Sequence, residues 1–122
     1  MHIYKNTWFQ RFARREKITD QMLVDTITRA EDGLIDADLG GNIIKQRIAR
    51  KGQGKSSGYR TIVIFKQGDK AFFVYGFAKS ERENLKENEL KYYKESAEIY
   101  LSMSNEQIDK LLKTSELTEI EQ

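Results

Sequence analysis

The feature that most constrains the fold is a pair of adjacent apolar runs that predicts a β-hairpin. Residues 59–66 and 71–78 are rich in β-branched and aromatic side chains, and Gly68 and Asp69 lie between them. Two such runs joined by a short glycine-containing turn are typical of paired antiparallel strands. The hairpin therefore places a β-sheet at the centre of the chain.

A third strand is predicted over residues 43–49, directly before a loop that contains three glycines. Ile44 and Ile48 fall on one face of this strand, and Lys45 and Arg47 fall on the other. This alternation is expected for a strand with one buried face. Three antiparallel strands therefore follow one another along the chain.

Helical spacing precedes and follows these strands. Residues 2–4 can form a short first strand, and Thr7 with Gln10 fits a capping box at the start of a helix. Thr19 can cap a second helix, with Gly33 near its end, and residues 84–101 predict a third. The apolar positions of the last two helices are Leu23, Ile27, Ala30 and Leu34, and then Leu90, Tyr93, Ala97 and Tyr100.

These elements predict an α+β fold, in which a small antiparallel sheet packs against helices in the order β-α-α-β-β-β-α. The length of 122 residues fits one modest core. We expect residues 1–101 to form this domain. Residues 102–122 predict a loosely attached, acidic, helical extension with a capping box at Ser104 and Gln107.

Composition limits the chemistry that the chain can perform. The sequence contains no cysteine, and its one histidine is His2, so we expect no metal site and no cofactor. A reaction must rest on Lys, Arg, Tyr, Ser, Asp or Glu. No apolar run reaches the roughly 18 residues that span a bilayer, and no signal-peptide pattern precedes the helices, so we expect a cytoplasmic protein without a membrane partner.

Charge is segregated along the chain. Residues 42–67 carry seven cations and no acid, whereas residues 102–122 carry five acids and two lysines. A cation-rich strand and glycine-containing loop suit contact with phosphates, and RNA is favoured over DNA. The alternative is a solvated sheet edge whose charges prevent aggregation. The RNA-binding candidates are Lys45, Arg47, Arg50 and Tyr92.

The aromatic residues divide between core and surface. Phe72, Phe73, Tyr75 and Phe77 could stack bases, but a central strand beneath helices favours a place in the core. Tyr93 belongs to the apolar stripe of its helix, which leaves Tyr92 free to meet a ligand. Trp8 is interpreted as a packing residue.

Two short segments carry a resemblance to a known family. Residues 56–60 read Ser-Ser-Gly-Tyr-Arg, and residues 78–82 read Ala-Lys-Ser-Glu-Arg after the aromatic strand. Over residues 40–100 the sequence resembles the RelE/ParE superfamily of bacterial type II toxins, with spacing closest to the HigB-like branch. The resemblance implies a cognate antitoxin and metal-independent cleavage of mRNA, usually on the ribosome.

The resemblance also implies roles for five residues. Lys51 would contact the phosphate, and Lys55 would add an adjoining basic contact. Arg60 would stabilise the transition state in which the 2′-hydroxyl of the RNA attacks the neighbouring phosphate. Lys79 and Arg82 would act from the turn after the last strand. The predicted catalytic residues are therefore Arg60, Lys51, Lys55, Lys79 and Arg82.

Two positions depart from the family pattern and leave the general acid and base unassigned. Ser80 stands where studied members carry an arginine, and Lys86 stands where they carry a tyrosine. Two other functions stay open: a ParE-like inhibitor of DNA gyrase, and a non-catalytic RNA-binding module. A further hypothesis is that the acidic segment folds over the basic one or contributes to antitoxin binding.

Overall fold

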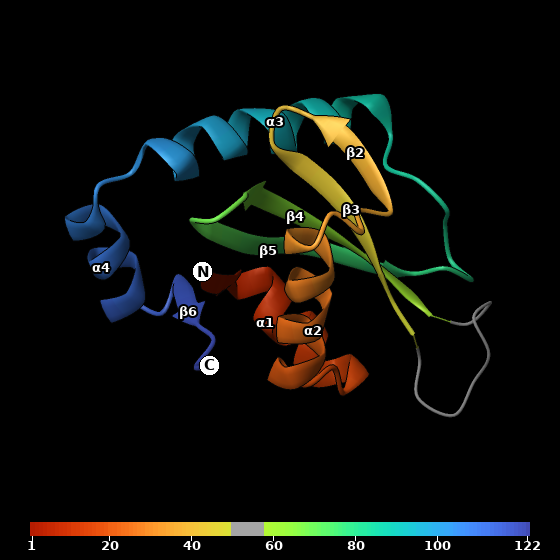
Figure 1. Cartoon of the computed structure of the whole chain (residues 1–122), viewed down its shortest axis with the longest axis horizontal. Helices are drawn as coiled ribbons and strands as arrows, with labels where there is room; N and C mark the ends of the chain where they lie inside the picture. Colours follow the sequence, from red (N-terminus) through yellow and green to blue (C-terminus); the bar gives the residue numbers. More distant parts are fainter. Residues whose placement is uncertain (50–57) are drawn as a thin grey trace.

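The chain folds into four helices and six strands in the part described by a computed structural model, residues 1–49 and 58–122 (Figure 1). The predicted α+β class is confirmed. The elements are β1 (His2–Asn6), α1 (Thr7–Glu16), α2 (Asp20–Glu31), β2 (Ala37–Gly40), β3 (Ile43–Ile48), β4 (Tyr59–Lys66), β5 (Lys70–Ala78), α3 (Glu87–Ser102), α4 (Asn105–Lys113) and β6 (Leu117–Glu119).

The strands form one sheet in the order β2-β3-β4-β5-β1-β6. The predicted hairpin of β4 and β5 is confirmed, and β3 pairs with β4 in the predicted antiparallel sense. β1 lies parallel to β5, so the sheet is mixed and not wholly antiparallel. β2 and β6 were not predicted, because strands of three or four residues carry too little alternation to be recognised.

Helices cover both faces of the sheet. α1 and α2 lie on one face, and α3 crosses the other (Figure 1). Phe72 and Phe73 of β5 are each fully buried, one in the core cluster beneath α3 and the other in the cluster beneath α1 and α2. Successive side chains of a strand point to opposite faces, so β5 is buried on both. This confirms the preference for a core position for these two rings.

The start of α1 differs by one residue from the prediction. Asn6 is the N-cap, and its Oδ1 accepts a hydrogen bond of 2.7 Å from the Phe9 backbone N–H. The other end of the same amide donates to the Val74 carbonyl at 3.1 Å. Thr7 instead donates from its hydroxyl to the Ser115 carbonyl at 3.3 Å. The contacts of Asn6 with Val74 and of Thr7 with Ser115 therefore decided which of the two residues caps the helix.

α2 begins as predicted but ends before Leu34. Thr19 caps the helix by accepting a hydrogen bond from the Met22 backbone N–H at 3.2 Å. Gly33 adopts a positive φ of 85°, which only glycine enters without steric cost, and turns the chain away from the helix axis. Leu34 is consequently 61% exposed, and its predicted place on the apolar stripe was wrong.

The C-terminal segment adds a strand to the sheet. α4 has the predicted capping box, in which Ser104 Oγ accepts from the Gln107 N–H at 3.2 Å. β6 then pairs with β1, and Leu117 and Ile120 are each 1% exposed. The expectation of a loose extension missed this strand. The Ile120 N–H also donates to the Ile3 carbonyl at 2.8 Å, which extends the pairing beyond β6.

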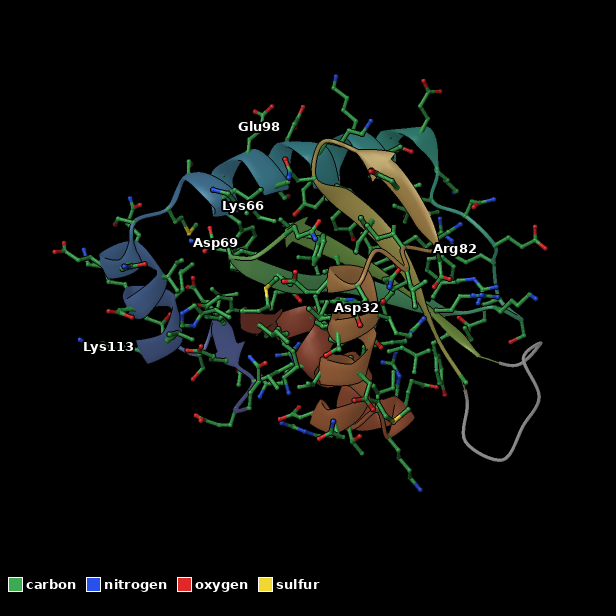
Figure 2. All side chains as sticks on the ribbon, viewed as in Figure 1. Asp32, Lys66, Asp69, Arg82, Glu98 and Lys113 are labelled. Carbon is green, nitrogen blue, oxygen red and sulfur yellow. The ribbon has the colours of Figure 1, made fainter. Side chains whose placement is uncertain are left out.

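β6 and β3 lie towards opposite edges of the sheet. In Figure 2, Lys113 at the end of α4 is correspondingly far from Arg82, which follows β5. Within residues 1–49 and 58–122, the acidic segment therefore does not fold over the basic strand β3, against the hypothesis for this part of the basic site. A contribution of this segment to antitoxin binding stays a prediction.

Candidate nucleic-acid interface

Three of the nine predicted site residues, Arg50, Lys51 and Lys55, lie outside the described residues. The other six are placed by β3, by the hairpin of β4 and β5, by the loop that follows it and by α3. They are Lys45, Arg47, Arg60, Lys79, Arg82 and Tyr92. Figure 2 shows Arg82 at one end of β4 and β5, with Lys66 and Asp69 at the other end.

Arg60 lies in a row of three residues across the sheet. The register pairs it with Arg47 of β3 and with Phe77 of β5. Directly opposed residues of neighbouring strands share a face, so the two arginines and the ring are side by side. Arg60 is partly exposed, and no acid in residues 1–49 or 58–122 forms an ion pair with it. Its guanidinium therefore keeps its donors for a ligand.

An open pocket of about 340 Å³ lies between α2 and the ends of β3 and β4. We call it the arginine pocket, because Arg29, Arg47 and Arg60 all line it, together with Asp25. Asp36 lies 3.3 Å from Arg47 and 3.8 Å from Arg29, so two guanidinium groups share this carboxylate. With three arginines against two acids, the neighbourhood keeps a net positive charge.

Arg29 was not among the predicted site residues. It belongs to α2, outside the basic segment, and its Nη2 donates to the Arg47 carbonyl at 2.6 Å. Residue spacing along the sequence gives no sign of this contact, because the two residues meet only when α2 packs on β3. The nearest available signal was that Arg29 stands in the last turn of α2, away from its apolar stripe.

Lys45 and Arg82 are engaged in a network that fastens the loop between β5 and α3. Lys45 Nζ donates to Asn84 Oδ1 at 2.6 Å, and Arg82 Nη2 donates to the Asn84 carbonyl at 3.0 Å. Arg82 also forms a two-point ion pair with Glu89. The hydrogen bond from Arg82, together with that from the Lys86 backbone N–H, lowers the pKa of Glu89. These cations hold the loop in place.

Lys79 follows β5 and lies opposite Gly58, two residues before Arg60. Its N–H donates to the Gly58 carbonyl at 3.0 Å, which joins the end of β5 to the start of β4. Within the described part of the chain, its ammonium group forms no ion pair. Lys79 and Arg60 thus differ from Lys45 and Arg82, whose donors are already occupied.

Aromatic side chains continue from this site towards α3. The Arg82 guanidinium carbon lies 5.3 Å from the ring centroid of Phe77 and 6.0 Å from that of Tyr75. Trp8 packs on Tyr75 at 4.5 Å between ring centroids, although it is 41% exposed. Tyr92 is 63% exposed and is therefore accessible, as predicted. Phe77 is buried in the core, whereas Tyr75 is only partly buried.

The two positions that depart from the family pattern are both exposed. Lys86 is the N-cap of α3, and its backbone N–H donates to Glu89 Oε1 at 2.7 Å. Ser80 lies in the turn after β5. The described residues contain no cluster of three or more His, Cys, Asp or Glu that could hold a metal ion. No described helix has the length and apolar character needed to cross a membrane.

A family model described as the RelE toxin of the RelE / RelB toxin-antitoxin system matches residues 1–120. The chain belongs to the RelE toxin family. This confirms the resemblance to RelE toxins, and it makes an antitoxin the partner of this RelE-family toxin. The match includes the C-terminal strand as well as the sheet and its helices. No curated protein matches the chain significantly.

Proposed function

We propose that this RelE-family toxin is a metal-independent endoribonuclease that cleaves mRNA on the ribosome and is held inactive by its cognate antitoxin. The observation that supports this best is Arg60, a guanidinium without an ion-pair partner among the described residues, which lies directly opposite Arg47 in the strand register and belongs to a residue on the lining of the arginine pocket. A cationic pocket of this kind suits the phosphate of a polynucleotide.

The proposed reaction uses the RNA's own 2′-hydroxyl as nucleophile. The 2′-oxygen loses its proton and bonds to the adjacent phosphorus, and the bond from phosphorus to the 5′-oxygen breaks. The products are a 2′,3′-cyclic phosphate and a 5′-hydroxyl, which takes up a proton. Negative charge grows on the non-bridging oxygens in the transition state. Donors already aimed at that position stabilise it without reorganisation.

Arg60 is proposed to supply those donors, because its guanidinium is planar and always charged. Lys79 is proposed as a second cation for the same phosphate, and Lys51 and Lys55 as contacts from the loop that precedes β4. Arg82 and Lys45 are engaged with Glu89 and Asn84, so we propose that they position the loop after β5. We assign none of these residues as the general acid or base.

The decisive experiment compares Arg60→Ala with Arg11→Ala in a purified translation system that contains a defined mRNA. Arg11 is an exposed arginine of α1 that does not line the arginine pocket, so its removal matches the change in charge outside that pocket. Loss of one preorganised donor costs roughly 100-fold or more in rate, which is the expected effect of Arg60→Ala. Primer extension locates the cuts, and circular dichroism shows whether both variants are folded.

Cleavage that persists in Arg60→Ala at the wild-type rate would contradict the role given to this residue. Intact mRNA with inhibited DNA supercoiling would identify a gyrase inhibitor. RNA binding without any cuts, under conditions in which translation continues, would identify a non-catalytic module. Each alternative function therefore has a distinct readout in the wild-type protein.

A further inference from the structure

We propose that a groove of aromatic side chains, which begins at Phe77 opposite Arg60 in the sheet, binds unpaired bases of single-stranded RNA. This inference rests on the proposed function and specifies how the substrate is held outside the cleaved bond. We call this surface the aromatic groove. It is formed by Trp8 of α1, by Tyr75 and Phe77 of β5, and by Tyr92, Tyr93 and Tyr100 of α3.

The aromatic groove consists of two adjoining pockets. One has a volume of about 280 Å³ and the other of about 210 Å³, and Trp8 and Tyr75 line both. The larger pocket continues to Phe77 and Arg82 at the end of β5. The smaller one is completed by tyrosines of α3, namely Tyr92, Tyr93 and Tyr100. The groove therefore runs from the row that contains Arg60 to the middle of α3.

The strand pairing explains why a groove exists here. β1 pairs with β5 only at residues 70–73, and the chain then turns into α1. From Val74 onwards β5 is left without a neighbouring strand on this side. Trp8 reaches this edge from α1, and Tyr93 reaches it from α3, with centroids 4.5 and 5.8 Å from that of Tyr75. Rings from both layers thus meet at one strand edge.

The chemistry of the groove suits bases. Aromatic faces stack on any base, and such contacts are worth about 1–3 kcal/mol for each base. Tyr92 and Trp8 are the large exposed rings of the groove. The hydroxyl groups of Tyr93 and Tyr100 form no hydrogen bond within residues 1–49 and 58–122, although hydroxyls of partly buried tyrosines usually have a partner. They are available to the polar edge of a base.

These hydroxyl groups stay protonated at neutral pH. Burial, with a smaller effect of the neighbouring Tyr75, raises the pKa of Tyr93 to about 12. Burial likewise raises the pKa of Tyr100. Both tyrosines can therefore donate as well as accept a hydrogen bond.

The charges around the groove are largely balanced. Arg82 is paired with Glu89, and Arg15, which lines the larger pocket, lies 3.2 Å from Glu16. Binding in the groove should therefore depend on stacking and only weakly on salt. Binding at Arg60, whose charge has no described counter-ion, should depend strongly on salt. The two parts of the interface can consequently be separated by experiment.

Trp8 is the only tryptophan of the sequence, so intrinsic fluorescence reports directly on the groove. The probe is a short single-stranded RNA with 2′-O-methyl groups, which cannot be cleaved by attack of the 2′-oxygen. We expect this strand to quench Trp8 and the corresponding duplex to leave the emission unchanged, because paired bases cannot enter the groove. Loss of the signal in Trp8→Phe identifies its source.

Tyr92→Ala tests the contact, and Ile99→Ala is its matched control. Both residues are exposed on α3, at 63% and 60%, but only Tyr92 lines the groove. Loss of one stacked base should weaken binding by roughly 5- to 150-fold without altering the salt dependence. For a cleavable RNA, Tyr92→Ala should raise KM and leave kcat unchanged, whereas Arg60→Ala should lower kcat.

A single strand that binds without changing Trp8 emission would overturn the inference, as would equal affinities of Tyr92→Ala and Ile99→Ala. If cleavage persists in either case, the proposed nuclease function stands without the groove. Quenching without any cleavage would support the groove and contradict the nuclease. If Tyr92→Ala weakens antitoxin binding and leaves RNA binding intact, the groove is a protein site, which also overturns the inference.

Discussion

Replacing Leu117 by alanine should destabilise the whole fold, although only five residues follow it in the sequence. Its side chain is 1% exposed and packs in the cluster that also contains Tyr4 and Ile108. The change removes about three carbon groups at ~0.8 kcal/mol each, and the remaining cavity adds to this loss. We therefore expect the free energy of unfolding to fall by about 3 kcal/mol.

Urea denaturation followed by circular dichroism measures this change. A loss of about 3 kcal/mol corresponds to a fall of roughly 10 °C in Tm for a domain of this size. The control is Ile99→Ala, which removes a similar side chain from an exposed position and should change the free energy of unfolding by less than about 0.5 kcal/mol. If Leu117→Ala is as mild as the control, β6 is not part of the cooperative core.

Two further variants test contacts near the site. Glu89→Gln should cost about 1 kcal/mol at neutral pH. Because Arg82 lowers the pKa of Glu89, this stabilisation is present above the ordinary carboxyl pKa and is lost as the pH falls through the lowered value. In urea melts, the difference in the free energy of unfolding between Glu89→Gln and wild type should therefore be smaller at low pH than at neutral pH. An equal difference at low and at neutral pH would refute the ion pair's role. Gly76→Ala should cost about 1–3 kcal/mol through overpacking. Its Cβ would lie 2.6 Å from the Phe12 ring, which Trp8 holds by stacking at 5.2 Å between centroids. The Phe12→Leu background should relieve the cost of Gly76→Ala, and an unchanged urea midpoint for Gly76→Ala alone would contradict the contact.

Local signals were sufficient for the longer elements. The alternation in β3, the glycine turn between β4 and β5 and the cap at Thr19 each depend on residues within a few positions of one another. Preferences that act between residues a few positions apart can be recognised from the sequence alone. Local preferences could not predict the N-cap of α1, because Asn6 and Thr7 both offer a suitable oxygen. Contacts with Val74 and Ser115, which are remote along the chain, decided between them.

The candidate site divides in the same way. The run of cations without acids selected the segment that contains Arg60, and the family resemblance gave this residue its role. The strand register then placed it beside Arg47. The charge run could not show which cations are neutralised. Asp36 and Glu89 stand outside that run, and they reach Arg47 and Arg82 only after the sheet and α3 have assembled.

The sequence by itself determined the β-hairpin, the helical segments, the clustering of cations before β4 and a chemistry without cysteine. Only the tertiary structure decided that β1 joins the sheet in parallel, that the last strand closes its edge, and that rings from three elements line one groove. The physical reason is the separation along the sequence of the residues that interact. Propensity, capping and alternation act over a few residues, whereas ion pairing, edge pairing and ring stacking act between residues that only the packed fold brings together.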